Sequence, residues 1–105
     1  MKSPNSILFA MLAFIFVGML TASALAWWVQ QARVDVQPTM VTATITNTHE
    51  REILCRGSVY GRTSIGTVLY NSGETTILPG RSVQIHVTTI RQNHFIDGWA
   101  EINCK

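Results

Sequence analysis

The sequence predicts an all-β fold, an antiparallel sandwich of six to seven short strands preceded by an N-terminal hydrophobic helix. Residues Met40–Thr46 and Ser82–Thr89 alternate between apolar and polar side chains, which is the period of a strand with one buried face. Turn-forming residues separate the strand patterns at intervals of about 8 to 12 residues. No apolar stripe of helical period follows residue 30.

Residues 1–26 have the organisation of an export signal. Lys2 precedes an uninterrupted apolar run, Ile7–Leu20, and small residues follow that include an Ala-x-Ala site at Ala24–Ala26 and a second one at Ala22–Ala24. The alternative is an uncleaved membrane anchor, because Ile7–Val29 contains no charge and exceeds the roughly 20 residues that cross a bilayer. Either way the positive end stays inside. We therefore expect an exported domain that is periplasmic, secreted or anchored on the outer side of the cytoplasmic membrane.

The chain after the leader is expected to form a linker and edge strand over residues 27–39 and one β-sandwich domain over residues 40–105. The edge strand is predicted around Val34–Val36. In the first strand of the domain, Met40–Thr46, the apolar side chains share one face. A polar turn follows, and a second strand over Ile53–Tyr60 directs Cys55 inward.

The second half of the domain is expected to contain short strands. Glycines predict a loop over Gly61–Gly66, and the turn formers Asn71, Ser72 and Gly73 separate two short strands over residues 67–70 and 75–78. The final strand, His94–Cys104, is expected to place Ile96 and Cys104 on its inner face. Phe95 and Trp99, four residues apart, would share the outer face.

Cys55 and Cys104 are the two cysteines of the chain. In an exported protein, two cysteines on the apolar faces of strands most simply form one disulfide. The sequence contains no Cys-x-x-Cys pair, which would indicate a redox or metal site instead. A disulfide is also expected to help because a domain this small buries little apolar surface.

Charge and motifs exclude several function classes. The formal net charge is only +2 and the basic residues are scattered, so nothing indicates a nucleic-acid surface. The sequence contains no Gly-x-Ser-x-Gly elbow and no phosphate-binding loop. We expect no enzymatic activity and no cofactor, and contact with a membrane only through residues 7–29 if they are not cleaved.

The aromatic residues predict a binding surface. If Tyr60 projects from the same sheet as Phe95 and Trp99, these rings form an exposed patch, and such patches mark interaction surfaces. The first functional hypothesis is therefore a noncatalytic envelope module that binds another protein through this face or a sheet edge. The alternative is a small periplasmic module for copper or zinc that uses His86 and His94 from neighbouring strands, with Met40 as a soft ligand.

Four stretches together carry a family resemblance: Thr42–Asn47, Cys55–Gly57, Leu78–Gly80 and Gly98–Cys104. They resemble the small immunoglobulin-like or fibronectin-III-like sandwich domains of exported bacterial proteins. The chain departs from antibody-type domains because no Trp follows Cys55 closely and Ile102 stands two residues before Cys104. The resemblance therefore does not imply the intersheet disulfide of those domains, but it does imply a binding or structural function.

Overall fold

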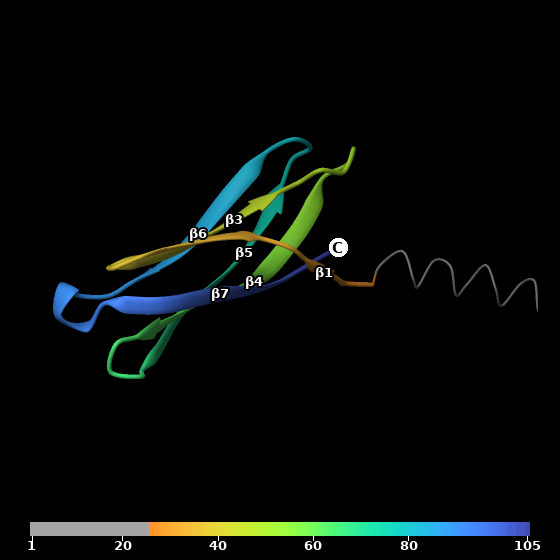
Figure 1. Cartoon of the computed structure of the whole chain (residues 1–105). Coiled ribbons are helices and arrows are strands. Elements are labelled where there is room, and N and C mark those ends of the chain that lie inside the picture. Colours follow the sequence, from red (N-terminus) through yellow and green to blue (C-terminus); the bar gives the residue numbers. More distant parts are fainter. Residues whose placement is uncertain (1–25) are drawn as a thin grey trace, which may run out of the picture.

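The computed structural model describes residues 26–105, which form an all-β domain of seven strands. A single 3-10 turn, η1, precedes the last strand (Figure 1). The elements are β1 (Trp28–Gln30), β2 (Arg33–Gln37), β3 (Met40–Thr46), β4 (Ile53–Thr63), β5 (Val68–Ile77), β6 (Ser82–Thr88), η1 (Arg91–Asn93) and β7 (Phe95–Cys104). The predicted N-terminal hydrophobic helix lies outside the described residues. Within residues 26–105 no helix has the length and apolar character to span a membrane.

The strands form two antiparallel sheets. One has the order β1-β7-β4-β5 and the other the order β2-β3-β6. The sheets face each other, with β2 near β7 along one side and β5 near β6 along the other, so the fold is sandwich-like (Figure 1). The predicted all-β class and antiparallel pairing are confirmed.

The two clearest sequence patterns form strands as expected. Along β3, Val41, Ala43 and Ile45 are buried while the residues between them are less buried. This strand pairs with β6 over its whole length, from Met40 opposite Thr88 to Thr46 opposite Ser82. Period-two alternation found these strands because one face of each packs against the other sheet.

The prediction of two short strands separated by a turn at residues 71–73 is wrong. Instead, β4 and β5 form one long hairpin that pairs from Ile53 opposite Ile77 to Arg62 opposite Val68. Its turn lies at residues 64–67, where Gly66 adopts a positive φ of 89°. Residues 71–73 stay extended because each pairs with a residue of β4. Gly73 lies opposite Gly57, and the hydroxyl groups of Ser72 and Ser58 are hydrogen-bonded at 2.6 Å.

Residues 27–39, expected as a linker with an edge strand, form two strands in the structure. The expected edge strand is β2, which pairs with β3. Trp28–Gln30 forms β1, which pairs with the end of β7 and places Trp28 opposite Cys104. The chain then crosses to the other sheet at Gln31 and Ala32, where Ala32 packs against the core. The folded domain therefore begins directly after Trp27.

The beginning of β7 departs from the expected alternation. A register irregularity between β4 and β7 places Asp97 opposite Arg62 and Phe95 opposite Thr63, so Ile96 is the extra residue of a bulge. Phe95 is consequently buried, with 4% of its surface exposed, and Ile96 is 59% exposed. The expectation that Phe95 lies on the outer face and Ile96 on the inner face is wrong. The larger aromatic side chain takes the core position because it buries more apolar surface.

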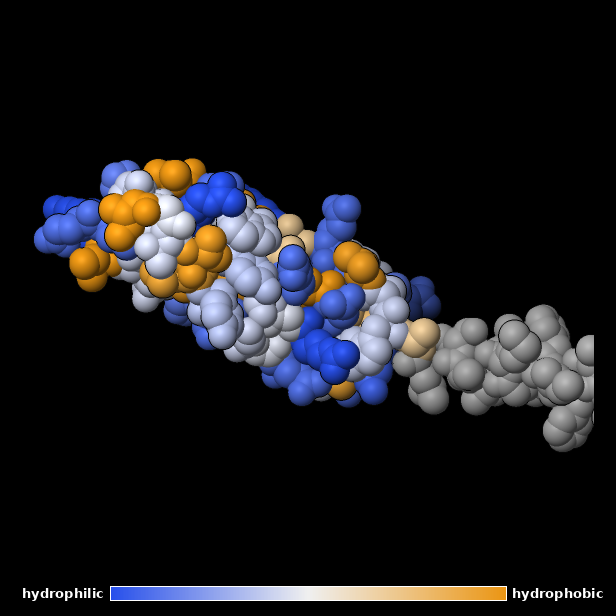
Figure 2. Space-filling view, turned by 90° about the horizontal axis from the view of Figure 1, so that it is seen from below, coloured by the Kyte–Doolittle hydropathy of each residue, from blue (hydrophilic) through white to orange (hydrophobic). Residues whose placement is uncertain are grey.

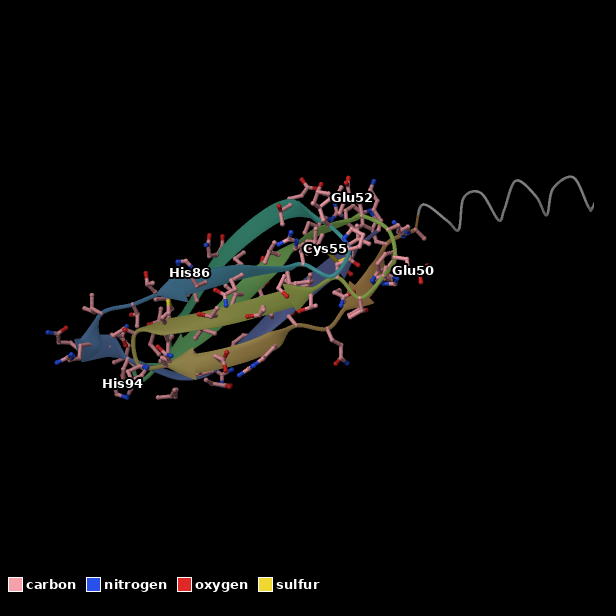
Figure 3. All side chains as sticks on the ribbon, turned by 90° about the horizontal axis from the view of Figure 1, so that it is seen from above. Glu50, Glu52, Cys55, His86 and His94 are labelled. Carbon is pink, nitrogen blue, oxygen red and sulfur yellow. A yellow bond between two sulfur atoms is a disulfide. The ribbon has the colours of Figure 1, made fainter. Side chains whose placement is uncertain are left out.

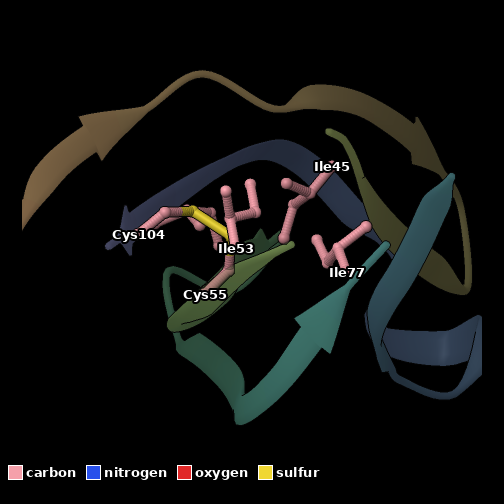
Figure 4. Packing of buried hydrophobic residues seen from close by; sticks show 6 residues of the cluster. Ile45, Ile53, Cys55, Ile77 and Cys104 are labelled. Atoms are coloured by element: carbon pink, nitrogen blue, oxygen red, sulfur yellow. A yellow bond between two sulfur atoms is a disulfide. The ribbon is translucent and has the colours of Figure 1, made fainter. Parts of the chain in front are cut away.

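The core consists of two groups of buried side chains between the sheets. One gathers around Ile45, Ile53 and Ile77 and includes the Cys55–Cys104 disulfide (Figure 4). The other gathers around Val41, Val59 and Phe95. The predicted disulfide is present, and it joins neighbouring strands of one sheet, since Cys55 lies directly opposite Cys104 in the β4–β7 register.

Buried Asn47 connects the loops at one end of the sandwich. Its side-chain Nδ2 donates to the carbonyl oxygens of Arg51, at 2.8 Å, and Ile77, at 2.9 Å, and its Oδ1 accepts from the backbone N–H of His49 at 2.8 Å. Its backbone N–H donates to Arg81 O at 2.9 Å. The residue thus holds the β3–β4 loop against the β5–β6 turn, which is why a fully buried polar side chain is tolerated.

Candidate partner-binding face

A row of three aromatic rings crosses the outer face of the four-stranded sheet. Tyr60 of β4 lies opposite Trp99 of β7 and opposite Tyr70 of β5. The rings of Tyr60 and Trp99 stack with centroids 5.4 Å apart and an angle of 9° between their planes. Tyr70 continues the row at 6.0 Å from Tyr60 and is 66% exposed. Among residues 26–105 no strand or helix forms a further layer over this face.

Charged and hydroxyl groups hold the row in position. The guanidinium of Arg62 lies 5.4 Å from the centre of the Trp99 ring and 3.9 Å from the Asp97 carboxylate. The Tyr60 hydroxyl donates to Glu101 Oε2 at 3.3 Å. Such cross-strand neighbours each contribute on the order of 0.2–1 kcal/mol, so they orient the rings without burying them.

Aliphatic side chains lie beside the row, at the end of the domain away from the start of β1. Ile65, in the β4–β5 turn, is 75% exposed, and Ile96, in the bulge, is also exposed. Val68 follows the same turn and is partly exposed. The turn lies against the start of β7, because Ser64 N–H donates to His94 O at 2.9 Å. Figure 2 shows hydrophobic surface gathered at this end.

We refer to these residues together as the partner face, which combines three aromatic rings with three aliphatic side chains on one side of the molecule. Its members are Tyr60, Tyr70, Trp99, Ile65, Val68 and Ile96. A shallow hollow of about 580 Å³ adjoins it at Tyr60 and continues along the outer face between Arg56 and Glu101. The face is thus apolar at its centre and polar along one border, as protein interfaces are.

A second hollow opens between the free edges of β5 and β6. It has a volume of about 210 Å³ and reaches the apolar side chains of Ile45, Ile85 and Ile102. Beside it, Asn71 Nδ2 donates to His86 O at 2.9 Å and so joins the two edge strands across the gap. Gly73 lines this hollow, and the nearest atom to a Cβ added there is Ile85 Cδ1 at 3.4 Å, so the absence of a side chain at Gly73 leaves the hollow open.

Of the three residues of the metal-binding alternative, Met40 and His86 lie on the paired strands β3 and β6, and His94 lies outside both strands. His86 is exposed on β6 opposite Thr42, Met40 begins β3 opposite Thr88, and His94 follows η1. Figure 3 shows His86 on the strand and His94 at the end of the domain. Over residues 26–105, no three side chains of His, Cys, Asp or Glu are grouped closely enough to hold a metal ion.

The structure thus brings together two of the three aromatic residues that the sequence indicated. Tyr60 and Trp99 stack on the outer face, whereas Phe95 is in the core. Four members of the partner face were not predicted. Tyr70 and Val68 were assigned to a separate short strand, Ile65 to a loop and Ile96 to the inner face of the last strand. Comparison of the chain with models of protein families, with curated proteins and with solved structures finds no match.

Proposed function

We propose that this chain is an exported, noncatalytic binding module that recognises another protein through the partner face. The observation that supports the proposal is the aromatic row, in which half-buried Tyr60 and Trp99 stack and Tyr70 is exposed, next to exposed aliphatic side chains. A small domain gains nothing in its own stability by leaving Ile65 and Tyr70 in water, whereas a partner would bury both. Tyrosine and tryptophan are also enriched where protein interfaces concentrate their binding energy.

Export is supported by the disulfide. Disulfides persist in oxidising compartments and are rare in the cytosol. The charge-free apolar segment at residues 7–26 agrees with export as well. The predicted resemblance to immunoglobulin-like or fibronectin-III-like domains is compatible with two antiparallel sheets of four and three strands, and it remains a proposal at the level of family.

The experiment is site-specific photocrosslinking in the cells that make the chain. A photoreactive residue replaces Val68, which lies on the partner face, or Gln84, which lies on the exposed outer face of the three-stranded sheet. We expect one discrete adduct from position 68 and none from position 84. Purified wild-type chain added to permeabilised cells should compete with the adduct at position 68.

The two positions form a matched pair, because both are exposed residues on strands and neither belongs to the core. Equal adduct patterns at positions 68 and 84, or none at either, would contradict the proposal. Circular dichroism of both variants before irradiation shows whether the domain has kept its β structure.

A further inference from the structure

At the end of the domain where β1 begins lie the β3–β4 loop, the β5–β6 turn and the C-terminal end of the described chain. We call this end of the domain the proximal end. The β3–β4 loop and the β5–β6 turn lie there, because Thr46 pairs with Ser82. The end of β7 lies there too, since Cys104 pairs with Trp28. In Figure 1 the described chain begins at this end, close to the C-terminus.

No spacer separates this end from the preceding apolar segment. The charge-free residues 7–26 reach the length that crosses a bilayer, and β1 already begins at Trp28. A single residue, Trp27, lies between them, and one or two extended residues span at most about 7 Å. If residues 7–26 are retained as an anchor, the proximal end lies at the level of the lipid headgroups.

The proximal end presents cations on tryptophan rings. The Arg56 guanidinium carbon lies 4.0 Å from the centre of the Trp27 ring, and Lys105 Nζ lies 4.9 Å from the same ring. Arg51 lies 5.5 Å from the centre of the Trp28 ring. In the part of the chain that the structure describes, none of these three cations is within ion-pair distance of a carboxylate. The ion pairs that do form use arginines elsewhere, Arg33 and Arg62.

We propose that the proximal end binds the surface of an anionic phospholipid membrane, with Arg56 and Lys105 contacting lipid phosphates. Two properties support lipid over other anions: a retained apolar segment would deliver this end to a bilayer, and tryptophan is enriched at membrane interfaces. A basic residue near an anionic leaflet strengthens attachment by about fivefold. The partner face, at the opposite end, would then point away from the membrane.

Three acidic side chains oppose this attraction. Exposed Glu74 lies opposite Arg56 in the register of β4 and β5. Glu50 and Glu52 lie in the same loop as Arg51, and Figure 3 shows them at the proximal end. Both are exposed. Because they would be repelled by anionic headgroups, their removal should strengthen binding, and this gives the proposal a test in the opposite direction.

The chain offers a direct chemical probe, because Lys105 is its only lysine besides Lys2. The full chain is reconstituted into vesicles of phosphatidylcholine alone or with phosphatidylglycerol, and Lys105 is acylated with a membrane-impermeant reagent. Peptide mass spectrometry measures the acylation rate. We expect Lys105 to react about fivefold more slowly in the anionic vesicles, and 1 M NaCl but not 10 mM inorganic phosphate should remove the difference.

Variants complete the test. Arg56→Gln should reduce the protection of Lys105, Glu50→Gln with Glu52→Gln should increase it, and Arg91→Gln at the opposite end should leave it unchanged. Equal acylation rates in the two kinds of vesicle at low salt would overturn the proposal, as would equal effects of Arg56→Gln and Arg91→Gln. Arg51→Gln supplies a second cation variant if Arg56→Gln fails to fold. The acylation rates of Lys105 do not depend on whether the partner face binds a protein.

Discussion

The ring of Phe95 occupies the space that a side chain on Gly61 would need. A Cβ atom built on Gly61 would overlap Cε1 and Cδ1 of that ring. The two residues lie on neighbouring strands of the same sheet, and the bulge at Ile96 turns the ring inward above the glycine. The glycine and the bulge are therefore two parts of one arrangement that closes the core beneath the partner face.

Replacing Phe95 or its neighbour Ile96 with alanine tests this arrangement. Phe95→Ala should lower the free energy of unfolding by about 3–5 kcal/mol, because it empties a core position. Ile96→Ala should change it by no more than about 0.5 kcal/mol, because Ile96 is exposed. Urea unfolding followed by circular dichroism measures both. If the side chains of β7 alternated without a bulge, Ile96→Ala would be more destabilising than Phe95→Ala. That result would refute the bulge.

Gly61 and Gly73 provide a second matched pair. Gly61→Ala should destabilise the domain by roughly 1–3 kcal/mol, because the Phe95 ring must move. At Gly73 the nearest atom to an added Cβ is Ile85 Cδ1 at 3.4 Å, so Gly73→Ala should be neutral or stabilising by up to about 1 kcal/mol. Thermal unfolding of the two variants compares them. Equal losses of stability would contradict the packing described here.

The disulfide should contribute much of the stability of the domain. Leu54 and Lys105 exchange two backbone hydrogen bonds, so Cys55 and Cys104 form the adjacent non-hydrogen-bonded pair with Cα atoms 4.0 Å apart. Closing a loop over a separation of 49 residues contributes about 4 kcal/mol in the chain-entropy description. Reduction should therefore shift the urea midpoint strongly downward. An unchanged midpoint after reduction, verified by alkylation of both thiols, would show that the disulfide contributes little.

Asn47 should matter more than an exposed asparagine. Asn47→Ala removes three side-chain hydrogen bonds and leaves the carbonyl oxygens of Arg51 and Ile77 without that donor, which should cost roughly 2–4 kcal/mol. Asn103→Ala makes the same chemical change on the outer face and should cost less than about 0.5 kcal/mol. The difference between their free energies of unfolding is the quantity to measure. Similar values for the two variants would mean that Asn47 does not hold the loops together.

The sequence predicted the parts of the fold that depend on local periodicity. The buried faces of β3 and β6 follow from alternation, and the disulfide follows from the presence of two cysteines on strands. The continuous strand β5 could not be predicted, because Gly73 favours a turn locally and only its pairing with Gly57 keeps it extended. The position of Phe95 could not be predicted either, since a bulge reverses the faces of a strand and leaves no mark in the periodicity.

The same limits apply to the candidate site. Tyr60 and Trp99 were placed on one outer face because each follows the alternation of a regular strand segment. Tyr70 joins them only because β5 is continuous, and Ile96 only because of the bulge. Both depend on pairing between strands that are distant in the sequence. The positions of Tyr70 and Ile96 in the partner face could therefore not be predicted from the sequence.

Photocrosslinking from position 68 tests whether the partner face binds a protein. The yield of the adduct is compared between a chain that is otherwise native and one that also carries Ile65→Ser and Ile96→Ser. Both serines replace exposed side chains, so the free energy of unfolding should change by less than about 1 kcal/mol. Loss of two apolar contacts at an interface should weaken binding by about tenfold or more and lower the yield accordingly. An undiminished yield from a stably folded double variant would contradict the proposed function.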